Sequence, residues 1–197
     1  MLLALMVLAA TAVPVSSEHV TGPEAAAFRA VNDLPDVPFA LVWIAMQAGN
    51  VGATLVAAFA ALRLRRRCLA TSLAVAGLAA WLLAKVVKAF VERERPAELV
   101  DDAVLRHAET GGLGWVSGHA AVTAALLTVA WPVLSPRWRR LLLVVAVLMN
   151  ASRVYVGNHL PLDMVGGSAL GVAVGAMVVL VGRLIECRAG GQALPRG

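Results

Sequence analysis

The chain has 197 residues, of which 60% are hydrophobic and 15% charged, and its mean hydropathy is +0.79. A soluble domain of this length does not need so much apolar surface, so these values exclude an ordinary water-soluble enzyme and predict one membrane-embedded domain over residues 1–197. The formal charge of +5 does not indicate nucleic-acid binding, because the basic residues gather at predicted membrane boundaries.

The first apolar run, residues 2–15, is short, and two interpretations of it stay open. Its small residues and the polar residues 16–18 that follow are typical of a cleaved signal peptide, whereas the absence of a preceding Lys or Arg favours a short first span. Residues 18–37 are polar and contain prolines. Within them, the segment from Glu24 to Asp33 is predicted to form a short helix at the membrane surface.

Five further apolar runs are long enough, or nearly so, to cross a membrane once. The second and sixth spans of the chain contain glycine and other small or amide residues, which suit close contact with neighbouring helices. The tail from Glu186 onward is expected to be loose. Spans two to six are predicted at residues 39–62, 68–90, 117–134, 141–156 and 164–185.

The loops between these spans differ in charge. One side of a six-span layout carries ten of the 17 basic residues and one of the 12 acidic residues, and the other side carries the remaining seven and eleven. Because positive loops stay in the cytoplasm, the Arg-rich side is predicted to be cytoplasmic. The expected fold is therefore an all-α, six-transmembrane-helix bundle in the cell membrane.

Three polar clusters, residues 88–96, 117–119 and 152–163, lie at the ends of spans on the predicted extracytoplasmic side. Ionisable residues inside a membrane bundle indicate function by default. Loops that meet at one end of a bundle can build one site. We therefore expect the catalytic loops at the extracytoplasmic end.

The third cluster combines an arginine, a histidine and an aspartate. If Pro161 begins a helix, His159 and Asp163 are four residues apart, a spacing at which side chains meet. A carboxylate beside an imidazole fixes its tautomer and stabilises its cationic form. Arg153 adds a planar, permanently charged group suited to phosphate. The alternative is a polar loop at the membrane edge with a helix-capping aspartate.

Each of the other two clusters, taken alone, is weaker evidence for a functional site. Lys88 and Arg95 are seven residues apart, which would place them on one helix face, but lysines at span ends often only reach for water. Ser117 is a candidate helix N-cap, and Gly118 permits close backbone approach, so together they predict an anion cradle at a helix N-terminus. His119, beside this cradle, is suited to donate a proton to a leaving oxygen.

Together the clusters resemble the signatures of the type 2 phosphatidic acid phosphatase family, integral-membrane lipid phosphatases related to the vanadium haloperoxidases. The family's signatures are Lys, six residues, then Arg-Pro; Pro-Ser-Gly-His; and Ser-Arg, five residues, His, three residues, Asp. The chain departs from them at Val116, which stands in place of the family's Pro and is expected to loosen the loop without removing a chemical group. The matching residues are Lys88 with Arg95-Pro96; Ser117-Gly118-His119; and Ser152-Arg153 with His159 and Asp163.

The resemblance implies a phosphatase that works through a phosphohistidine. His159 would attack phosphorus, Asp163 would orient the imidazole, and His119 would protonate the departing oxygen and then activate water. No cluster has metal-ligand spacing with spare carboxylates, so we expect no cofactor and activity without a divalent ion. The phosphate-binding groups would be Lys88, Arg95, Ser117, Gly118 and Arg153, and Ser152 is a further candidate contact.

The expected substrate is a lipid phosphate at the outer face of the plasma membrane, and undecaprenyl diphosphate is the first candidate by analogy with bacterial members. Phosphatidic acid, phosphatidylglycerol phosphate and other prenyl phosphates are rivals, and a phosphotransferase would use an acceptor other than water. A transporter would require ionisable residues near mid-membrane and an internal repeat, neither of which is clear. A non-catalytic scaffold would release no phosphate. The residues indicate no oligomeric state.

Overall fold

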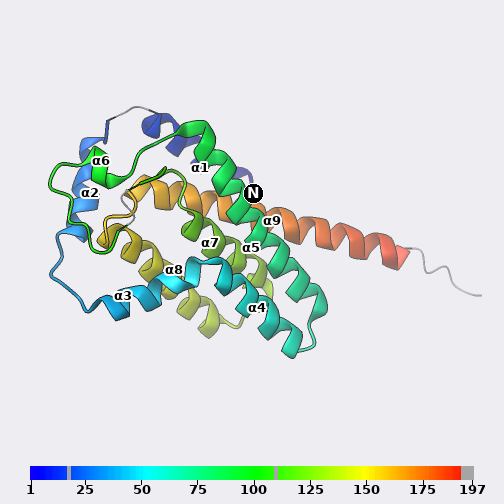
Figure 1. The fold of residues 1–197 in the computed structure, drawn as a ribbon. Helices are drawn as coiled ribbons and strands as arrows, with labels where there is room; N and C mark the ends of the chain where they lie inside the picture. The colour runs from blue at the N-terminus through cyan, green and yellow to red at the C-terminus, as the bar shows by residue number, and fades with distance from the viewer. Residues whose placement is uncertain (17–18, 109–110, 192–197) are drawn as a thin grey trace, which may run out of the picture.

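The computed structural model describes residues 1–16, 19–108 and 111–191, and every regular element within these ranges is a helix. The predicted all-α class is therefore confirmed. The α-helices are α1 (Leu2–Val15), α2 (Gly22–Asn32), α3 (Phe39–Met46), α4 (Val51–Arg63), α5 (Arg67–Val91), α6 (Pro96–Leu99), α7 (Gly118–Ala130), α8 (Pro136–Tyr155) and α9 (Pro161–Gly191), with 3₁₀ turns η1 (Gln47–Gly49) and η2 (Trp131–Val133). Figure 1 shows them gathered along α9, whose last turns extend beyond the bundle.

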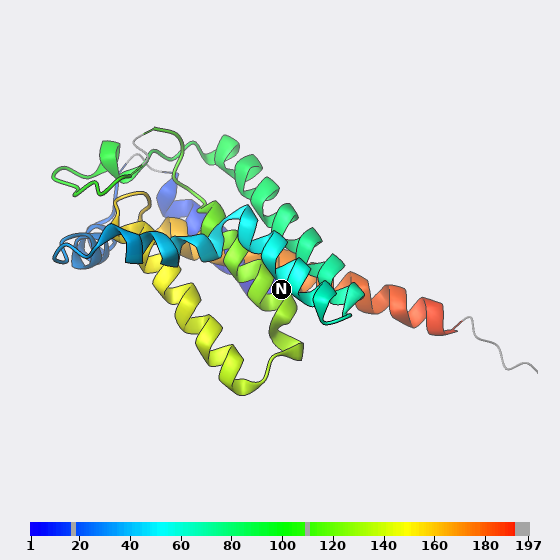
Figure 2. The same cartoon turned by 60° about the horizontal axis from the view of Figure 1, so that its bottom comes forward.

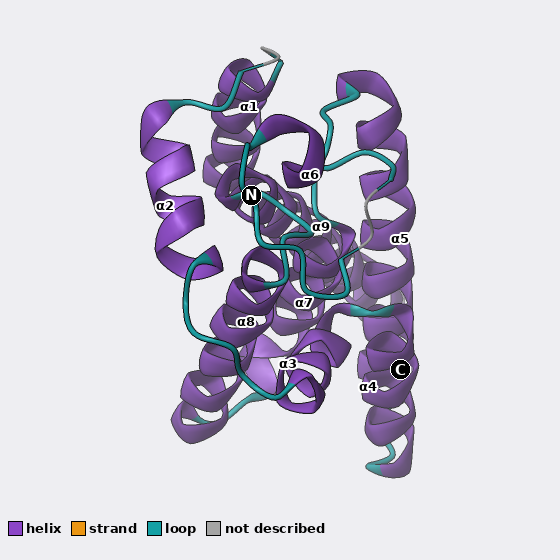
Figure 3. Ribbon diagram, turned by 60° about the vertical axis from the view of Figure 1, so that its left-hand side comes forward, coloured by secondary structure: helices purple, strands orange, loops and turns teal. Residues whose placement is uncertain are grey.

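The core is built around the contact of α7 with α9, and α5 and α1 pack on this pair. Figure 3, which looks along the bundle, shows α7 and α9 inside a ring of the other helices. Their close approach depends on small residues: a Cβ added to Gly171 would overlap the carbonyl oxygen of Ala121, and one added to Gly167 would overlap that of Ser117. The predicted close contact of the glycine-rich last span is therefore confirmed.

Two glycines of α9 give a matched test of this packing. Gly171→Ala should lower the free energy of unfolding by about 1–3 kcal/mol, because the helices must separate to admit the methyl group. Gly182→Ala meets nothing within 4 Å, so the better helix propensity of alanine should leave stability unchanged or raise it by up to about 1 kcal/mol. Thermal unfolding in detergent measures both. Equal effects of the two variants would contradict the tight α7–α9 contact.

The predicted second span is broken rather than continuous. Helices α3 and α4 are bent by 64° at η1, so the expectation of one helix over residues 39–62 was wrong. Gly49 in this break packs on His119, where a Cβ would overlap the histidine backbone. Asn50 then begins α4, because its side chain accepts a hydrogen bond of 2.8 Å from the Ala53 amide. The break therefore carries the chain past the first turn of α7.

Membrane-crossing length is reached by two stretches of the described residues, Arg67–Leu99 and Pro161–Ile185, and by a third if the bent α3–α4 pair counts as one span. Helix α1 and the α7–η2 segment are apolar but shorter. The six-span layout thus stays a prediction. Helix α9 continues through Gly191, so the tail is helical for longer than expected, and residues 192–197 lie outside the described residues.

Helix α2 forms where a surface helix was predicted, but it packs on the bundle. Glu24, Phe28 and Asn32, spaced by four residues, are all buried and so define one inward face. Phe28 belongs to an apolar cluster with Met149 of α8 and Leu160 before α9. Figure 2 shows α8 leaning away from α9 along its length, and α2 covers the end where the two helices come together.

Candidate active site

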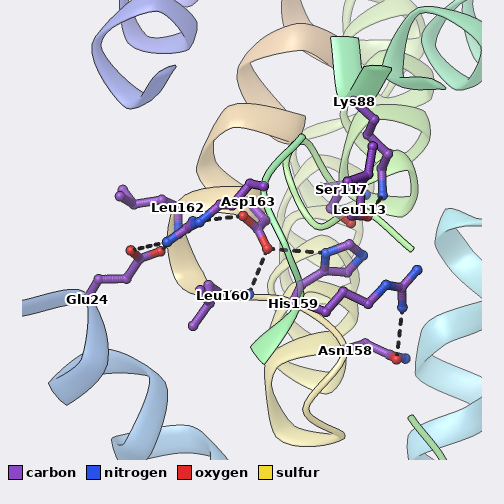
Figure 4. A network of polar contacts seen from close by, with 12 residues as sticks. Glu24, Lys88, Leu113, Ser117, Asn158, His159, Leu160, Leu162 and Asp163 are labelled. Carbon is purple, nitrogen blue, oxygen red and sulfur yellow. Dashed lines mark hydrogen bonds and ion pairs between the residues drawn. The ribbon is translucent and has the colours of Figure 1, made fainter. Parts of the chain in front are cut away.

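The three polar clusters lie together at one end of the bundle. The backbone amide of Ser117 donates to the carbonyl oxygen of Asp163 at 3.0 Å, which joins the second cluster to the third. The first cluster meets the third where Arg95 Nη1 donates to Asn158 Oδ1 at 3.3 Å. Figure 4 shows Lys88, Ser117, His159 and Asp163 close to one another, although they come from different helices and turns. The predicted convergence is thus observed.

Lys88 and Arg95 reach the site by different routes, and the prediction that they share a helix face was wrong. Helix α5 ends at Val91, because Glu92 adopts a left-handed conformation with φ of 50°. Lys88, in the last turn of α5, donates to the carbonyl oxygen of Leu113 at 2.6 Å. Arg95 is buried in the loop just before α6. The turn at Glu92 therefore brings Arg95 back towards the α8–α9 turn.

His159 and Asp163 are held by the start of α9, which begins at Pro161 as predicted. Asp163 Oδ2 accepts a hydrogen bond of 2.9 Å from the Leu160 amide and lies 3.4 Å from His159 Nδ1. The carboxylate therefore caps the helix as in a capping box and also contacts the imidazole, so both interpretations of the sequence are found. His159 and Asp163 are 2% and 0% exposed.

Burial determines the protonation of His159, which lies in the turn between α8 and α9. Loss of water lowers the pKa of the imidazole from 6.5 to about 4, and the positive charges of Arg153 and Lys88 act in the same direction. The hydrogen bond and charge of Asp163 oppose the shift without cancelling it. At neutral pH His159 is therefore an uncharged imidazole whose Nδ1 faces the Asp163 carboxylate.

This shift gives a pH prediction. The acid limb of kcat/KM, which reports the free enzyme, should fall near pH 4 rather than near 6.5. Stability should follow the same group: unfolding lets His159 take up a proton between pH 6.5 and 4, so stability is full above 6.5 and is lost as the pH falls towards 4. Initial rates and unfolding midpoints measured against pH check both. An acid limb near 6.5 would mean that water reaches the imidazole.

The second cluster forms the N-terminus of α7. Ser117 is the N-cap, and its side chain accepts from the Ala120 amide at 3.5 Å. Gly118 is the first residue of this 13-residue helix, and His119 lies half-buried in its first turn against Gly49. The predicted N-cap and helix start are therefore found, and the binding of an anion there stays a prediction.

Val116, which stands in place of the family's Pro, packs into the core of the bundle. Its side chain is fully buried in the main apolar cluster beside Trp115. A Cβ added to Gly166 of α9 would lie 3.1 Å from Val116 Cγ1. These side-chain contacts restrain the backbone where a proline ring would otherwise do so, and the expected loosening of the loop stays a prediction.

Arg153 and Ser152 occupy the last turn of α8, and both are buried. Arg153 is close enough to His159 for its charge to act on the imidazole. Ser152 donates its hydroxyl hydrogen to the carbonyl oxygen of Met149 at 2.7 Å, within its own helix. The structure thus gives Arg153 a place beside the histidine and gives Ser152 a local partner.

Two charged residues at the site were missed from the sequence. Arg93 Nη1 donates to Asp163 Oδ1 at 2.9 Å, and its Nη2 donates to Glu24 Oε2 at 2.6 Å. Burial lowers the pKa of Arg93, but the bonds and charges of Glu24 and Asp163 outweigh it and raise that pKa, so the guanidinium stays charged. Losing one partner from such a buried group typically costs about 3–5 kcal/mol.

The sequence contained a signal for Arg93 but not for Glu24. Arg93 lies inside the first signature, between Lys88 and Arg95, and its pattern there is the same as that of any charged residue at a membrane boundary. Glu24 is 69 residues away from Arg93 in the chain, and only the packing of α2 brings the two together.

Among the described residues, no group of three or more His, Cys, Asp and Glu side chains is arranged to hold a metal ion. The charged groups near His159 are Lys88, Arg153 and Asp163, and Asp163 is in turn bound by Arg93 and through it by Glu24. Such a site is suited to hold a phosphate by cations and backbone amides.

Known proteins resemble this chain in both sequence and fold. An undecaprenyl-diphosphatase of Sulfolobus acidocaldarius is 34% identical over 113 residues, covering 54% of this chain and 52% of the relative. A phosphatidylglycerophosphatase B of Bacillus subtilis is 37% identical over 101 residues, covering 46% of this chain and 47% of the relative. The chain thus spans about half the length of each of these relatives.

The crystal structure of a transmembrane PAP2-type phosphatidylglycerolphosphate phosphatase from Bacillus subtilis has the same fold, with a TM-score of 0.76 at 22% identity over 93% of this chain and 96% of that one. The profile of the PAP2 superfamily matches residues 65–185, which include all three signatures and most of the helices that carry them. The chain therefore belongs to the PAP2 superfamily.

Proposed function

We propose that the protein is a membrane lipid phosphatase that forms a phosphohistidine at His159. The observation that carries the proposal is the contact of the three signature segments, with the buried His159–Asp163 pair among Lys88, Arg95 and Arg153. Cations around an uncharged nucleophile attract a phosphate and stabilise the charge of its transition state.

The reaction proceeds in two displacements. His159 Nε2 forms a bond to phosphorus while the bond to the leaving oxygen breaks, and that oxygen takes a proton from His119. The imidazole keeps the proton on Nδ1, and Asp163 stabilises its positive charge. Water then gives a proton to His119 and attacks phosphorus, which releases inorganic phosphate and restores His159. The non-bridging oxygens are held by Lys88, Arg95, Arg153, the Ser117 side chain and the Gly118 amide.

A lipid substrate suits the apolar surroundings of the site. Thr123, one helical turn after His119 on α7, lines an apolar cavity of about 550 Å³ between α4, α5, α7 and α8. The cavity runs from Thr123 to Arg66, the residue before α5, and its lining is almost wholly apolar, so it suits an acyl or prenyl chain. We also propose that the chain crosses the plasma membrane six times and that the site faces the outside of the cell.

Undecaprenyl diphosphate is the first candidate substrate, in line with the activity named for the Sulfolobus relative. Phosphatidylglycerol phosphate is the second, because the Bacillus relative and the similar crystal structure are both named for it. Phosphatidic acid and transfer to an acceptor other than water are further alternatives within the same chemistry. We also propose that no divalent ion is required.

The test is phosphate release by purified protein in detergent with EDTA, across undecaprenyl diphosphate, phosphatidylglycerol phosphate and phosphatidic acid. We expect release from at least one lipid, fastest from undecaprenyl diphosphate, and no stimulation by added magnesium. Turnover that disappears in EDTA and returns with magnesium would overturn the metal-free proposal. No release from any lipid would overturn the phosphatase.

A further inference from the structure

We infer that Glu24 on α2 is a positioning residue for the nucleophile, acting on Asp163 through Arg93. The inference rests on the proposed phosphohistidine mechanism and adds a helix outside the signature motifs to the residues that support it. Glu24, Arg93 and Asp163 form one continuous buried chain. Figure 4 shows Glu24 and Asp163 at the two ends of the dashed contacts that link them.

The contacts in this chain are close and directional. Glu24 binds Arg93 with both carboxylate oxygens, at 3.1 and 2.6 Å, and Arg93 Nη1 reaches Asp163 Oδ1 at 2.9 Å. The side chains of Glu24 and Arg93 are each 3% exposed. A two-point contact fixes the plane of the guanidinium, and that plane sets the direction from which Asp163 is approached.

Glu24 also supports the helix that carries Asp163. Leu160, which precedes α9, has no side-chain oxygen that could cap the free amides of the first turn. Glu24 Oε1 fills this role from another helix, because it accepts the Leu162 amide at 3.0 Å. Asp163 meanwhile caps the Leu160 amide. Removing Glu24 therefore loosens Asp163 at its side chain and at its backbone together.

The charges explain why a carboxylate is needed at residue 24. His159 faces the cations Lys88 on α5 and Arg153 on α8, and Asp163 is the anion that balances the charge on its imidazole. Arg93 also binds Asp163, at Oδ1, and its positive charge offsets part of the negative charge of that carboxylate. Because Glu24 neutralises part of the positive charge of Arg93, Asp163 keeps more of its negative charge to stabilise the phosphohistidine.

The experiment compares Glu24→Gln with Glu94→Gln, a control that removes the same charge from an exposed residue of the Arg93 loop. Glu24→Gln should lower kcat by about tenfold, the low end of the losses seen when the hydrogen-bond partners that orient metal-binding residues are removed, and leave KM within about twofold. Glu24→Asp, which keeps the charge on a shorter side chain, should recover part of kcat. Glu94→Gln should match the wild type.

A double variant tests whether Glu24 acts through Arg93. Glu24→Gln combined with Arg93→Gln should be no slower than Arg93→Gln alone, because the glutamine oxygen can still accept from the Leu162 amide and the path through Arg93 is already broken. Losses that multiply in the double variant would overturn the inference, as would wild-type kcat in Glu24→Gln. If Glu24→Gln does not fold, Glu24→Asp decides: a lower kcat at unchanged KM supports positioning, and wild-type kcat overturns it.

The outcomes separate this inference from the proposed function. Wild-type protein that releases no phosphate from any lipid removes both. An active wild type whose Glu24→Gln variant equals Glu94→Gln in kcat and KM removes only the role of Glu24.

Discussion

Replacing His159 by alanine should abolish phosphate release and leave the bundle folded. The variant loses Nε2, the nitrogen proposed to attack phosphorus, while the backbone amides that bind Asp163 and begin α9 remain. We expect kcat to fall by about 10³-fold or more, as when other covalent catalysts lose their nucleophile. The measurement is initial phosphate release from the best lipid, with thermal unfolding as the check on folding.

His107→Ala provides the matched control. His107 is an exposed histidine in the loop before α7 that contacts the Phe39 ring, outside the three signature segments. It should keep wild-type kcat. Full activity of folded His159→Ala would assign the nucleophile to another residue.

Asp163→Asn should lower kcat by about 10²-fold or more, although only one atom changes. The oxygens of Asp163 face donors only: the Leu160 amide and His159 Nδ1 at Oδ2, and Arg93 at Oδ1. An asparagine NH₂ must point at one of these donors, so one contact becomes repulsive whichever way the amide turns. The imidazole then loses its orientation and the anion that balances its charge.

The measurement for Asp163→Asn is kcat on the same lipid, together with the unfolding midpoint. Arg93 remains paired with Glu24 in this variant, so we expect a folded protein whose main loss is in turnover. A variant with normal kcat would show that Asp163 only caps α9.

The positions of the candidate site residues could be predicted because the contacts within each signature are local in sequence. Spacing within the third signature brought His159 and Asp163 together across Pro161, and Ser117 was recognisable as a helix N-cap. Hydrophobic runs predicted both ends of α5 to within one residue and the ends of α7, α8 and α9 to within six, since the end of an apolar run is usually where a helix meets polar surroundings.

The features that the sequence did not predict depend mostly on contacts between distant segments. The break at Gly49 follows from a close approach to His119, about which residues 39–62 carry no information of their own. The left-handed turn at Glu92 separates Lys88 from Arg95, and a left-handed glutamate is not a sequence signal. In the sequence, Glu24 looks like an ordinary acidic residue in the first turn of a surface helix. Only tertiary packing brings it against Arg93.

The central proposal is that His159 takes the phosphoryl group from the lipid. Its most direct measurement uses a lipid diphosphate labelled with radioactive phosphorus on the terminal phosphate, rapid quenching in alkali, which preserves phosphohistidine, and peptide mapping of the protein. We predict transient label on the peptide that contains His159, and none in His159→Ala. Wild-type turnover with no labelled peptide, or with label on another residue, would contradict the proposal.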